Sequence, residues 1–219
     1  MRPAIPSLWS APNLLSLSRV LAAPALYALV VWPGRYGFFA ALLLFALASF
    51  TDTLDGELAR RRGQVTPFGI YLDTTADKIL VAVLLIALAV VHLAPGWMAA
   101  LIIAREFLVT GLRSYAAALG VIIPAGGWGK AKTAVTIAAI MFVLLAGDVA
   151  HSGVLSQAAG ARAFFLGALG PFTAPQWGLL IAVIWTVGSG IEYVWDAIPL
   201  LGRGARTPVA RTPAGHDEP

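Results

Sequence analysis

Four aspartates at fixed spacing are the residues of this chain best suited to chemistry: Asp52, Asp55, Asp73 and Asp77. The chain around them is strongly apolar, and one acidic side chain at the centre of a membrane helix costs about 2.5–3.5 kcal/mol. Four carboxylates therefore need compensation, and divalent cations in a wet cavity are the simplest source of it. All-oxygen ligands favour hard ions, so we expect a site for Mg²⁺ or Mn²⁺, with two ions rather than one.

The spacing places the aspartates on two helix faces. Asp52 and Asp55 are three residues apart, so they share one face of a helix. Asp73 and Asp77 are four residues apart and share a face of the next helix. A short polar loop, residues 61–67, joins the helices antiparallel, so both pairs are expected to point into one cavity. The alternative is that each pair is solvated at a helix end, but two facing pairs in so apolar a chain favour the metal site.

Cationic and small residues lie close to the aspartates in the sequence. Arg60 and Lys78 add positive charge, which suits an anionic substrate. Glycine inside a helix costs about 0.5–1 kcal/mol relative to alanine. Gly56 and Gly69 are therefore expected to admit something bulky close to the backbone.

The composition is that of an integral membrane protein. The 219 residues are 59% hydrophobic and 12% charged, against roughly 25% charged in soluble domains, and the mean hydropathy is +0.82. Cysteine is absent, which excludes disulfides and thiolate metal sites. Membrane topology and anionic lipid account for the net charge of +4, so no nucleic-acid partner is expected.

Apolar runs separated by proline, glycine and charged residues predict an all-α membrane protein with six transmembrane helices. The expected spans are residues 14–32, 36–50, 68–92, 97–119, 130–149 and 176–200, and the second continues as a helix through residue 60. A short interfacial segment (1–13) precedes them, and a longer connection covers 150–175. The transmembrane domain is expected to cover residues 1–202, before a polar, proline-containing tail (203–219) that we expect to be disordered.

The lysines and arginines orient the chain. With the N-terminus inside, most of them fall in cytoplasmic segments, and the outer loops hold Arg35 and Arg162. We therefore expect a multi-pass protein of the cytoplasmic (inner) membrane with both termini in the cytoplasm. The four aspartates then lie at the cytoplasmic ends of the second and third spans.

A second group of charged residues suits a phosphate group of the substrate. Arg105 and Arg113 fall inside the fourth span, where an unpaired arginine is costly. Lys130 and Lys132 open the fifth span. We expect these four side chains to form a basic cup, with arginine supplying bidentate phosphate contacts. Two alternatives stay open: Glu106 or another acid pairs an arginine structurally, and Lys132 is an interfacial anchor.

The residues between the aspartates match a known pattern. From Asp52 to Asp77 the chain reads D-x2-D-G-x2-A-R-x8-G-x3-D-x3-D with every spacer correct, and it resembles the signature of the CDP-alcohol phosphatidyltransferase family. The segments PNLLSLSRV, ADKILVA, AREFLVTGLR and GWGKAKT resemble the phosphatidylglycerophosphate synthases of that family. Ser16 stands where such synthases often carry threonine, and it keeps the hydroxyl. Residues 150–175 and the tail match no family pattern.

This resemblance implies six transmembrane helices around a cytoplasm-facing polar cavity, in a homodimer. It implies that Asp52, Asp55 and Asp73 bind metal, and that Asp77 completes the metal site or acts as general base. The cytidine nucleotide pocket would be lined by Gly56, Ala59, Arg60 and Gly69. Asn13 is a weaker candidate at the substrate mouth, because a helix N-cap role explains it equally well.

The implied reaction transfers a phosphatidyl group from CDP-diacylglycerol to sn-glycerol 3-phosphate, giving phosphatidylglycerophosphate and CMP. Arg105, Arg113, Lys130 and Lys132 would bind the glycerol phosphate, and Asp77 would take the proton of the attacking hydroxyl. No histidine lies near the aspartates in the predicted topology, so direct in-line displacement is favoured. One alternative keeps the family but uses inositol phosphate, serine or phosphatidylglycerol as acceptor. Another is a divalent-cation transporter, which predicts acids spread along a pathway rather than clustered.

Overall fold

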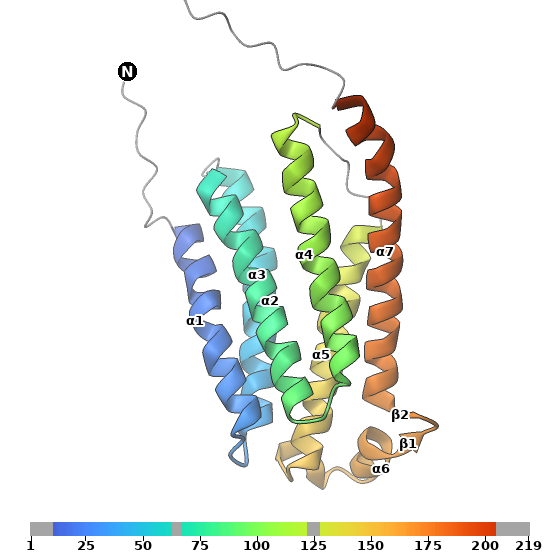
Figure 1. Ribbon diagram of the computed structural model, residues 1–219. Coiled ribbons are helices and arrows are strands. Elements are labelled where there is room, and N and C mark those ends of the chain that lie inside the picture. Colours follow the sequence, from blue (N-terminus) through green and yellow to red (C-terminus); the bar gives the residue numbers. More distant parts are fainter. Residues whose placement is uncertain (1–10, 63–66, 122–127, 205–219) are drawn as a thin grey trace, which may run out of the picture.

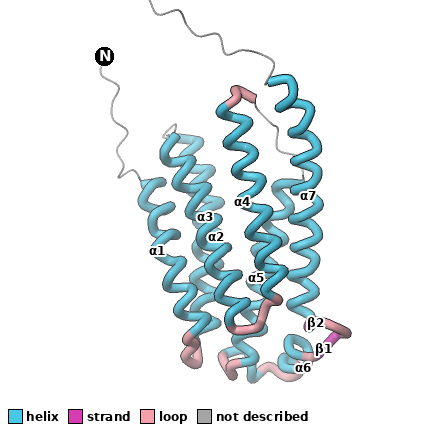
Figure 2. Tube along the Cα trace, viewed as in Figure 1, coloured by secondary structure: helices cyan, strands magenta, loops and turns pink. Residues whose placement is uncertain are grey.

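The computed structural model describes residues 11–62, 67–121 and 128–204, which form a bundle of long helices (Figure 1, Figure 2). The long helices are α1 (Ala11–Val31), α2 (Gly37–Arg62), α3 (Pro67–Val90), α4 (Gly96–Ala118), α5 (Trp128–Ala150) and α7 (Ala174–Gly204). Short elements join α5 to α7: the 3₁₀ helix η1 (Val154–Gln157), α6 (Ala161–Leu166), and the antiparallel strands β1 (Ala168–Leu169) and β2 (Phe172–Thr173). The fold is therefore essentially all-α, as the sequence predicts.

Each stretch expected to be helical is confirmed as one helix, with ends that differ by no more than four residues. Turn-forming residues set these ends: Pro33 and Gly34 follow α1, and Pro95 precedes α4. Helix α2 runs from its apolar half through residue 62 without a break, so the acidic segment continues the preceding helix. Helix α7 runs to Gly204, two residues past the predicted domain boundary, and residues 205–219 lie outside the described part.

The long helices pack in a ring whose order differs from their order in the chain. Helix α1 packs against α2 and α3, α4 packs against α3 and α7, and α5 packs against α2 and α7. The ring order is therefore α1, α3, α4, α7, α5, α2. Large side chains such as Phe45, Leu84, Met98 and Leu144 are fully buried in the core that these helices share.

The outside of the bundle is apolar. Leu21, Leu47, Phe50, Ile184 and Trp195 are between 61% and 75% exposed, in a protein whose core is already filled by other apolar residues. Soluble monomers rarely expose contiguous apolar patches larger than a few hundred Å². Three described segments are long and apolar enough to cross a bilayer, Asn13–Val31, Ala131–Ala150 and Ala174–Leu200, and Gly37–Thr51 is a shorter apolar stretch. These features identify a multi-pass all-α membrane protein.

The connection between α5 and α7 folds as a small cap on one end of the bundle. Asp148, buried near the end of α5, accepts a hydrogen bond from the backbone N–H of Leu155 at 2.7 Å. Gly153 lies so close to that carboxylate that a side chain at this position would overlap it. The indole N–H of Trp177 on α7 donates to the carbonyl of Leu169 at 2.8 Å. The cap is thus tied to both helices that it joins.

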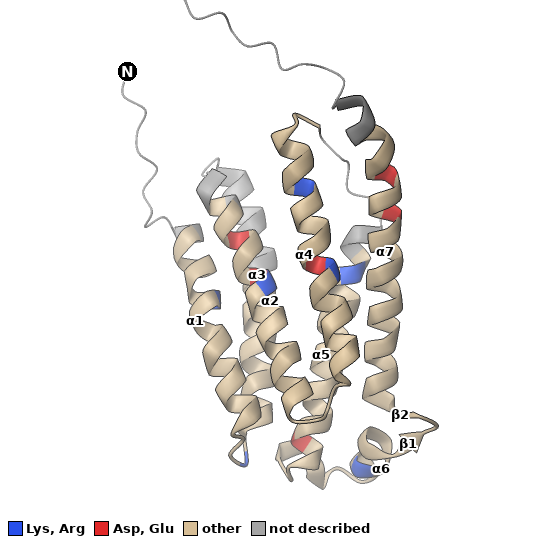
Figure 3. Cartoon of the chain, viewed as in Figure 1, with Lys and Arg blue, Asp and Glu red and all other residues tan. Residues whose placement is uncertain are grey.

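Polarity divides the bundle along its length. The first residue of α1 and the last residues of α2, α4 and α7 lie at the end opposite the cap (Figure 1). Charged residues of the described helices lie mostly in the half nearer that end (Figure 3). The charged residues that could take part in chemistry therefore lie in one half of the bundle, on helices that the ring brings together.

Candidate functional site

Asp73 on α3 is held by two residues of α1. Ser16 Oγ donates a hydrogen bond to Asp73 Oδ1 at 3.2 Å, and Arg19 Nη2 lies 3.0 Å from the same oxygen. Ser16 and Arg19 are 2% and 3% exposed, whereas the Asp73 side chain is 47% exposed. The carboxylate is therefore oriented from its buried side while much of it stays accessible.

Arg19 is a candidate that sequence reasoning missed. The clue in the sequence is an energetic one: an arginine inside an apolar helix is costly to bury and needs a partner. The aspartate motif begins at residue 52, and its spacing carries no information about α1. Packing of α1 on α3 brings the two regions together, and it also explains the position of the Ser16 hydroxyl.

Asp77, one helical turn after Asp73, lines a small cavity of about 40 Å³ between α3, α4 and α5. Its polar walls include Lys78, Glu106, Thr133 and Thr136, and apolar side chains complete it. Asp77 of the motif and Glu106 of α4 therefore face the same space. The cavity has room for water and enough polar groups to bind it.

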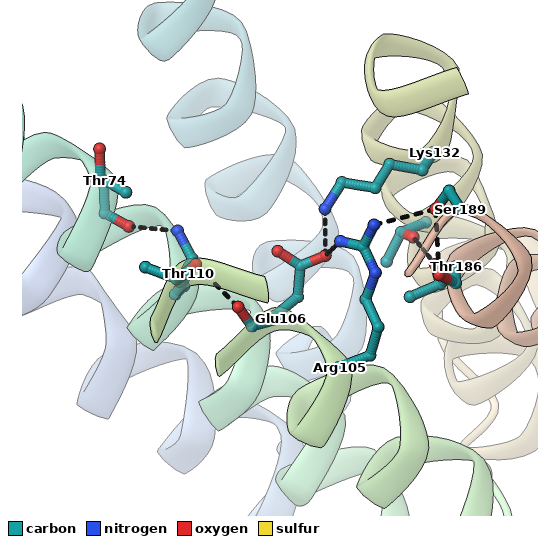
Figure 4. Close-up of polar contacts among 9 residues, drawn as sticks. Thr74, Arg105, Glu106, Thr110, Lys132, Thr186 and Ser189 are labelled. Carbon is teal, nitrogen blue, oxygen red and sulfur yellow. Dashed lines mark hydrogen bonds and ion pairs between the residues drawn. The ribbon is translucent and has the colours of Figure 1, made fainter. Parts of the chain in front are cut away.

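A compact charged cluster joins α4, α5 and α7 (Figure 4). Arg105 Nη1 donates to Glu106 Oε1 at 2.9 Å, and Lys132 Nζ lies 2.5 Å from the same oxygen. Arg105 Nη2 donates to Ser189 Oγ at 2.9 Å. The side chains of Arg105 and Lys132 are 9% and 15% exposed. The structure thus brings two of the four predicted phosphate-binding cations together, and it also shows the Glu106–Arg105 pair that the alternative anticipated.

Arg113 lies apart from this cluster. It is eight residues and about 12 Å farther along α4 than Arg105. Its Nε donates to Tyr193 Oη at 3.5 Å, and its guanidinium carbon lies 5.4 Å from the centre of the Tyr193 ring. The side chain is exposed. Arg113 is therefore placed toward the end of the bundle opposite the cap and not beside Glu106.

For several predicted site residues the structure describes the course of the helix and nothing more. They are Asp52, Asp55, Gly56, Ala59 and Arg60 of α2, and Lys130 of α5. Gly69 lies in the first turn of α3. Asn13 is 5% exposed and is the third residue of α1. Because Asn13 lies inside the helix, it is not the residue that caps it.

The described carboxylates fit a hard divalent cation. Asp73 is half-exposed and is anchored through Oδ1, and Asp77 follows it on the same face of α3. Carboxylate oxygens are the ligands that Mg²⁺ and Mn²⁺ prefer. Within the described residues no three acidic, histidine or cysteine side chains gather as a metal site, and the side chains of Asp52 and Asp55 lie outside that set.

Comparison with known proteins gives a consistent result. Residues 9–187 match the family model described as CDP-alcohol phosphatidyltransferase. Three similar proteins are each named CDP-diacylglycerol–glycerol-3-phosphate 3-phosphatidyltransferase. The protein from Bacillus subtilis is 35% identical over 87% of this chain and 98% of its own length. Those from Pseudomonas fluorescens and Escherichia coli K12 are 43% and 37% identical, over 61% and 72% of this chain and 71% and 86% of their own lengths.

Proposed function

This chain belongs to the CDP-alcohol phosphatidyltransferase family, and we infer that it transfers a phosphatidyl group from CDP-diacylglycerol to sn-glycerol 3-phosphate. The products are phosphatidylglycerophosphate and CMP, which places the protein in phospholipid biosynthesis. The names of three relatives that are 35–43% identical support this acceptor.

One observation of the structure carries the proposal furthest. Asp77 of the family motif shares a cavity with Glu106, and Glu106 holds both Arg105 and Lys132. An acidic motif suited to metal and a cationic pair suited to phosphate therefore adjoin each other inside an apolar bundle. A transferase that joins a diphosphate donor to a phosphate-bearing acceptor needs this juxtaposition, because both substrates are anionic and must meet at one phosphorus atom.

The donor is proposed to bind at the motif of α2 and α3. Asp52, Asp55, Asp73 and Asp77 would hold one or two divalent cations, and the nucleotide would lie against Gly56, Ala59, Arg60 and Gly69, near Asn13. When bound, the cations would offset the charge of the diphosphate and the charge that develops on the departing CMP. Ser16 and Arg19 keep the Asp73 carboxylate oriented for this role.

The acceptor is proposed to bind through Arg105 and Lys132. Lys130 precedes Lys132 by two residues on α5, and Arg113 lies toward the end of the bundle opposite the cap. Arginine and lysine differ here, because guanidinium can contact two phosphate oxygens at once. The terminal hydroxyl oxygen of glycerol phosphate forms a bond to the phosphorus that carries diacylglycerol. The bond between that phosphorus and CMP breaks, and Asp77 accepts the hydroxyl proton.

The proposed topology has six transmembrane helices, both termini in the cytoplasm of a cytoplasmic-membrane protein, and the polar cavity open to the cytoplasm. The ring of long helices and the position of the charged half at the end opposite the cap support it. The bias of lysine and arginine between the loops supports the orientation. A homodimer is proposed from the family resemblance.

A direct assay tests the acceptor. Purified protein with CDP-diacylglycerol, Mg²⁺ and radiolabelled sn-glycerol 3-phosphate is expected to form labelled phosphatidylglycerophosphate and to release CMP. Inositol phosphate, serine and phosphatidylglycerol serve as rival acceptors in parallel reactions. A faster reaction with any rival would contradict the choice of acceptor while leaving the family intact.

Removal of divalent cations is expected to stop the reaction. Chelation should abolish transfer, and added Mg²⁺ or Mn²⁺ should restore it, because the carboxylates alone would repel the diphosphate. Product formation that is unchanged by exhaustive chelation would overturn the metal site. Sealed vesicles that contain the protein but no CDP-diacylglycerol test for transport. Rapid uptake of Mg²⁺ into these vesicles would favour a transporter instead.

Arg113→Ala is expected to raise the KM for glycerol phosphate about ten-fold, the effect of losing one charge-assisted hydrogen bond. The KM for CDP-diacylglycerol should change little, because the described contact of Arg113 is with Tyr193 of α7. Steady-state kinetics with each substrate varied in turn measures both constants. An equal rise in the two would count against a role in acceptor binding.

A further inference from the structure

The side chain of Arg105 crosses from α4 to α7 over a glycine. Gly190 is buried, and a Cβ atom at this position would lie 2.9 Å from Arg105 Cγ and 3.1 Å from Arg105 Nε. These atoms belong to the middle of the arginine side chain. Rotation of the terminal guanidinium alone would not relieve the overlap, so an alanine at 190 requires the middle of the Arg105 side chain to move relative to α7.

Ser189 holds the far end of the same side chain. Its Oγ accepts a hydrogen bond from Arg105 Nη2 at 2.9 Å and donates to the carbonyl of Thr186 at 3.0 Å. A hydroxyl has one proton, and here the α7 backbone uses it, so the oxygen presents its lone pairs to Arg105. The serine is therefore oriented as an acceptor before any substrate arrives.

The guanidinium is held at two points and keeps donors for a ligand. Nη2 binds Ser189 on α7, and Nη1 binds Glu106 on α4, whose carboxylate also binds Lys132. Five N–H donors are available on arginine, and these two contacts leave others unused. Nε is buried and has no hydrogen-bond partner among the described residues. The arrangement keeps Arg105 and Lys132 convergent.

We propose that Gly190 and Ser189 are positioning residues for the acceptor-phosphate site: the missing side chain at 190 gives Arg105 its path across α7, and the hydroxyl of Ser189 fixes the guanidinium beside Lys132. The proposal rests on the function inferred above, since it assigns Arg105 to the phosphate of the acceptor. Both residues lie beyond residue 187, where the match to the family model ends. The match to the family model therefore assigns them no role.

The test compares two glycines of the same helix. Gly190→Ala is expected to raise the KM for glycerol phosphate about ten-fold, as expected for displacing one charge-assisted contact, and to leave the KM for CDP-diacylglycerol unchanged. Gly188→Ala is the matched control, because a Cβ atom there would have no neighbour within 4 Å. Both changes replace glycine by the better helix former, so a general effect on α7 should be the same for the two.

A double-mutant cycle separates positioning from a purely structural effect. If Gly190 acts through Arg105, Gly190→Ala should add nothing to the KM of an Arg105→Ala variant. Ser189→Ala provides a second probe without added bulk, with an expected rise in the same KM of a few fold, also absent on the Arg105→Ala background. This variant keeps the proposal testable if Gly190→Ala fails to insert.

Each outcome has one meaning. A large effect of Arg105→Ala with no effect of Gly190→Ala or Ser189→Ala would overturn the positioning role and leave the proposed function standing. Additive effects in the cycle, or equal effects of Gly188→Ala and Gly190→Ala, would also overturn it. No transfer to glycerol phosphate by the wild-type protein, or no effect of Arg105→Ala on this KM, would remove the premise and the proposal together.

Discussion

Asp73→Asn is expected to reduce phosphatidyl transfer at least about a thousand-fold, because charge stabilisation by a bound metal is worth several kcal/mol and each 1.4 kcal/mol is a factor of ten. Asparagine keeps the shape of the side chain and an oxygen that Ser16 and Arg19 can still reach. What it loses is the negative charge that a divalent cation requires. The rate should therefore fall while the protein still inserts and folds, measured as turnover per inserted molecule at saturating Mg²⁺.

Asp148→Asn provides the matched control for this variant. Asp148 belongs to the cap at the opposite end of the bundle, where its Oδ2 accepts the Leu155 N–H. An asparagine oxygen can accept the same hydrogen bond, so transfer is expected to stay close to the wild-type rate. Retention of more than a tenth of the activity by Asp73→Asn, or an equal loss in Asp148→Asn, would contradict a metal-binding role for Asp73.

The helices of this protein could be predicted because their signals are local. Proline and glycine interrupt the apolar runs at Pro33, Gly34 and Pro95. Beyond its first residue, α2 contains a single glycine, Gly56, and it does not end the helix before residue 62. The ring order could not be predicted in the same way. Whether α1 lies beside α3 or α5 depends on how side chains interlock between segments far apart in the chain, and the period of apolar residues does not encode that.

The elements of the cap, and the residues that hold the charged side chains of the site, could not be predicted from the sequence for related reasons. The elements η1, α6, β1 and β2 are too short for apolar periodicity to identify, so residues 150–175 were expected only as a connection. The motif singled out Asp73 and Asp77, because their four-residue spacing places them on one face of α3. The residues that orient the charged groups, Arg19, Ser189 and Gly190, belong to other helices and become neighbours only on packing.

Arg19→Met is expected to lower kcat/KM for CDP-diacylglycerol about 10–100-fold, the usual cost of removing a group that orients a metal-binding residue. Methionine fills much of the same volume, so the packing of α1 should be preserved. Insertion should be unchanged or improved, since a charge within a membrane helix costs about 2.5–3.5 kcal/mol on the insertion scale. Activity is thus predicted to fall without any loss of insertion, a combination that loss of folding would not produce.

The response to Mg²⁺ shows how Arg19 acts. Loss of a neighbouring positive charge does not weaken the attraction between the carboxylates and a divalent cation, so the defect should be one of orientation, and excess Mg²⁺ should not rescue it. Arg35→Met is the control, because Arg35 is an exposed residue beside Tyr36 at the opposite end of α1. Full recovery of Arg19→Met at high Mg²⁺ would mean that Arg19 supports metal affinity instead. Wild-type kinetics in Arg19→Met would show that the ion pair of the buried Arg19 with Asp73 serves the packing of α1 on α3 and not the reaction.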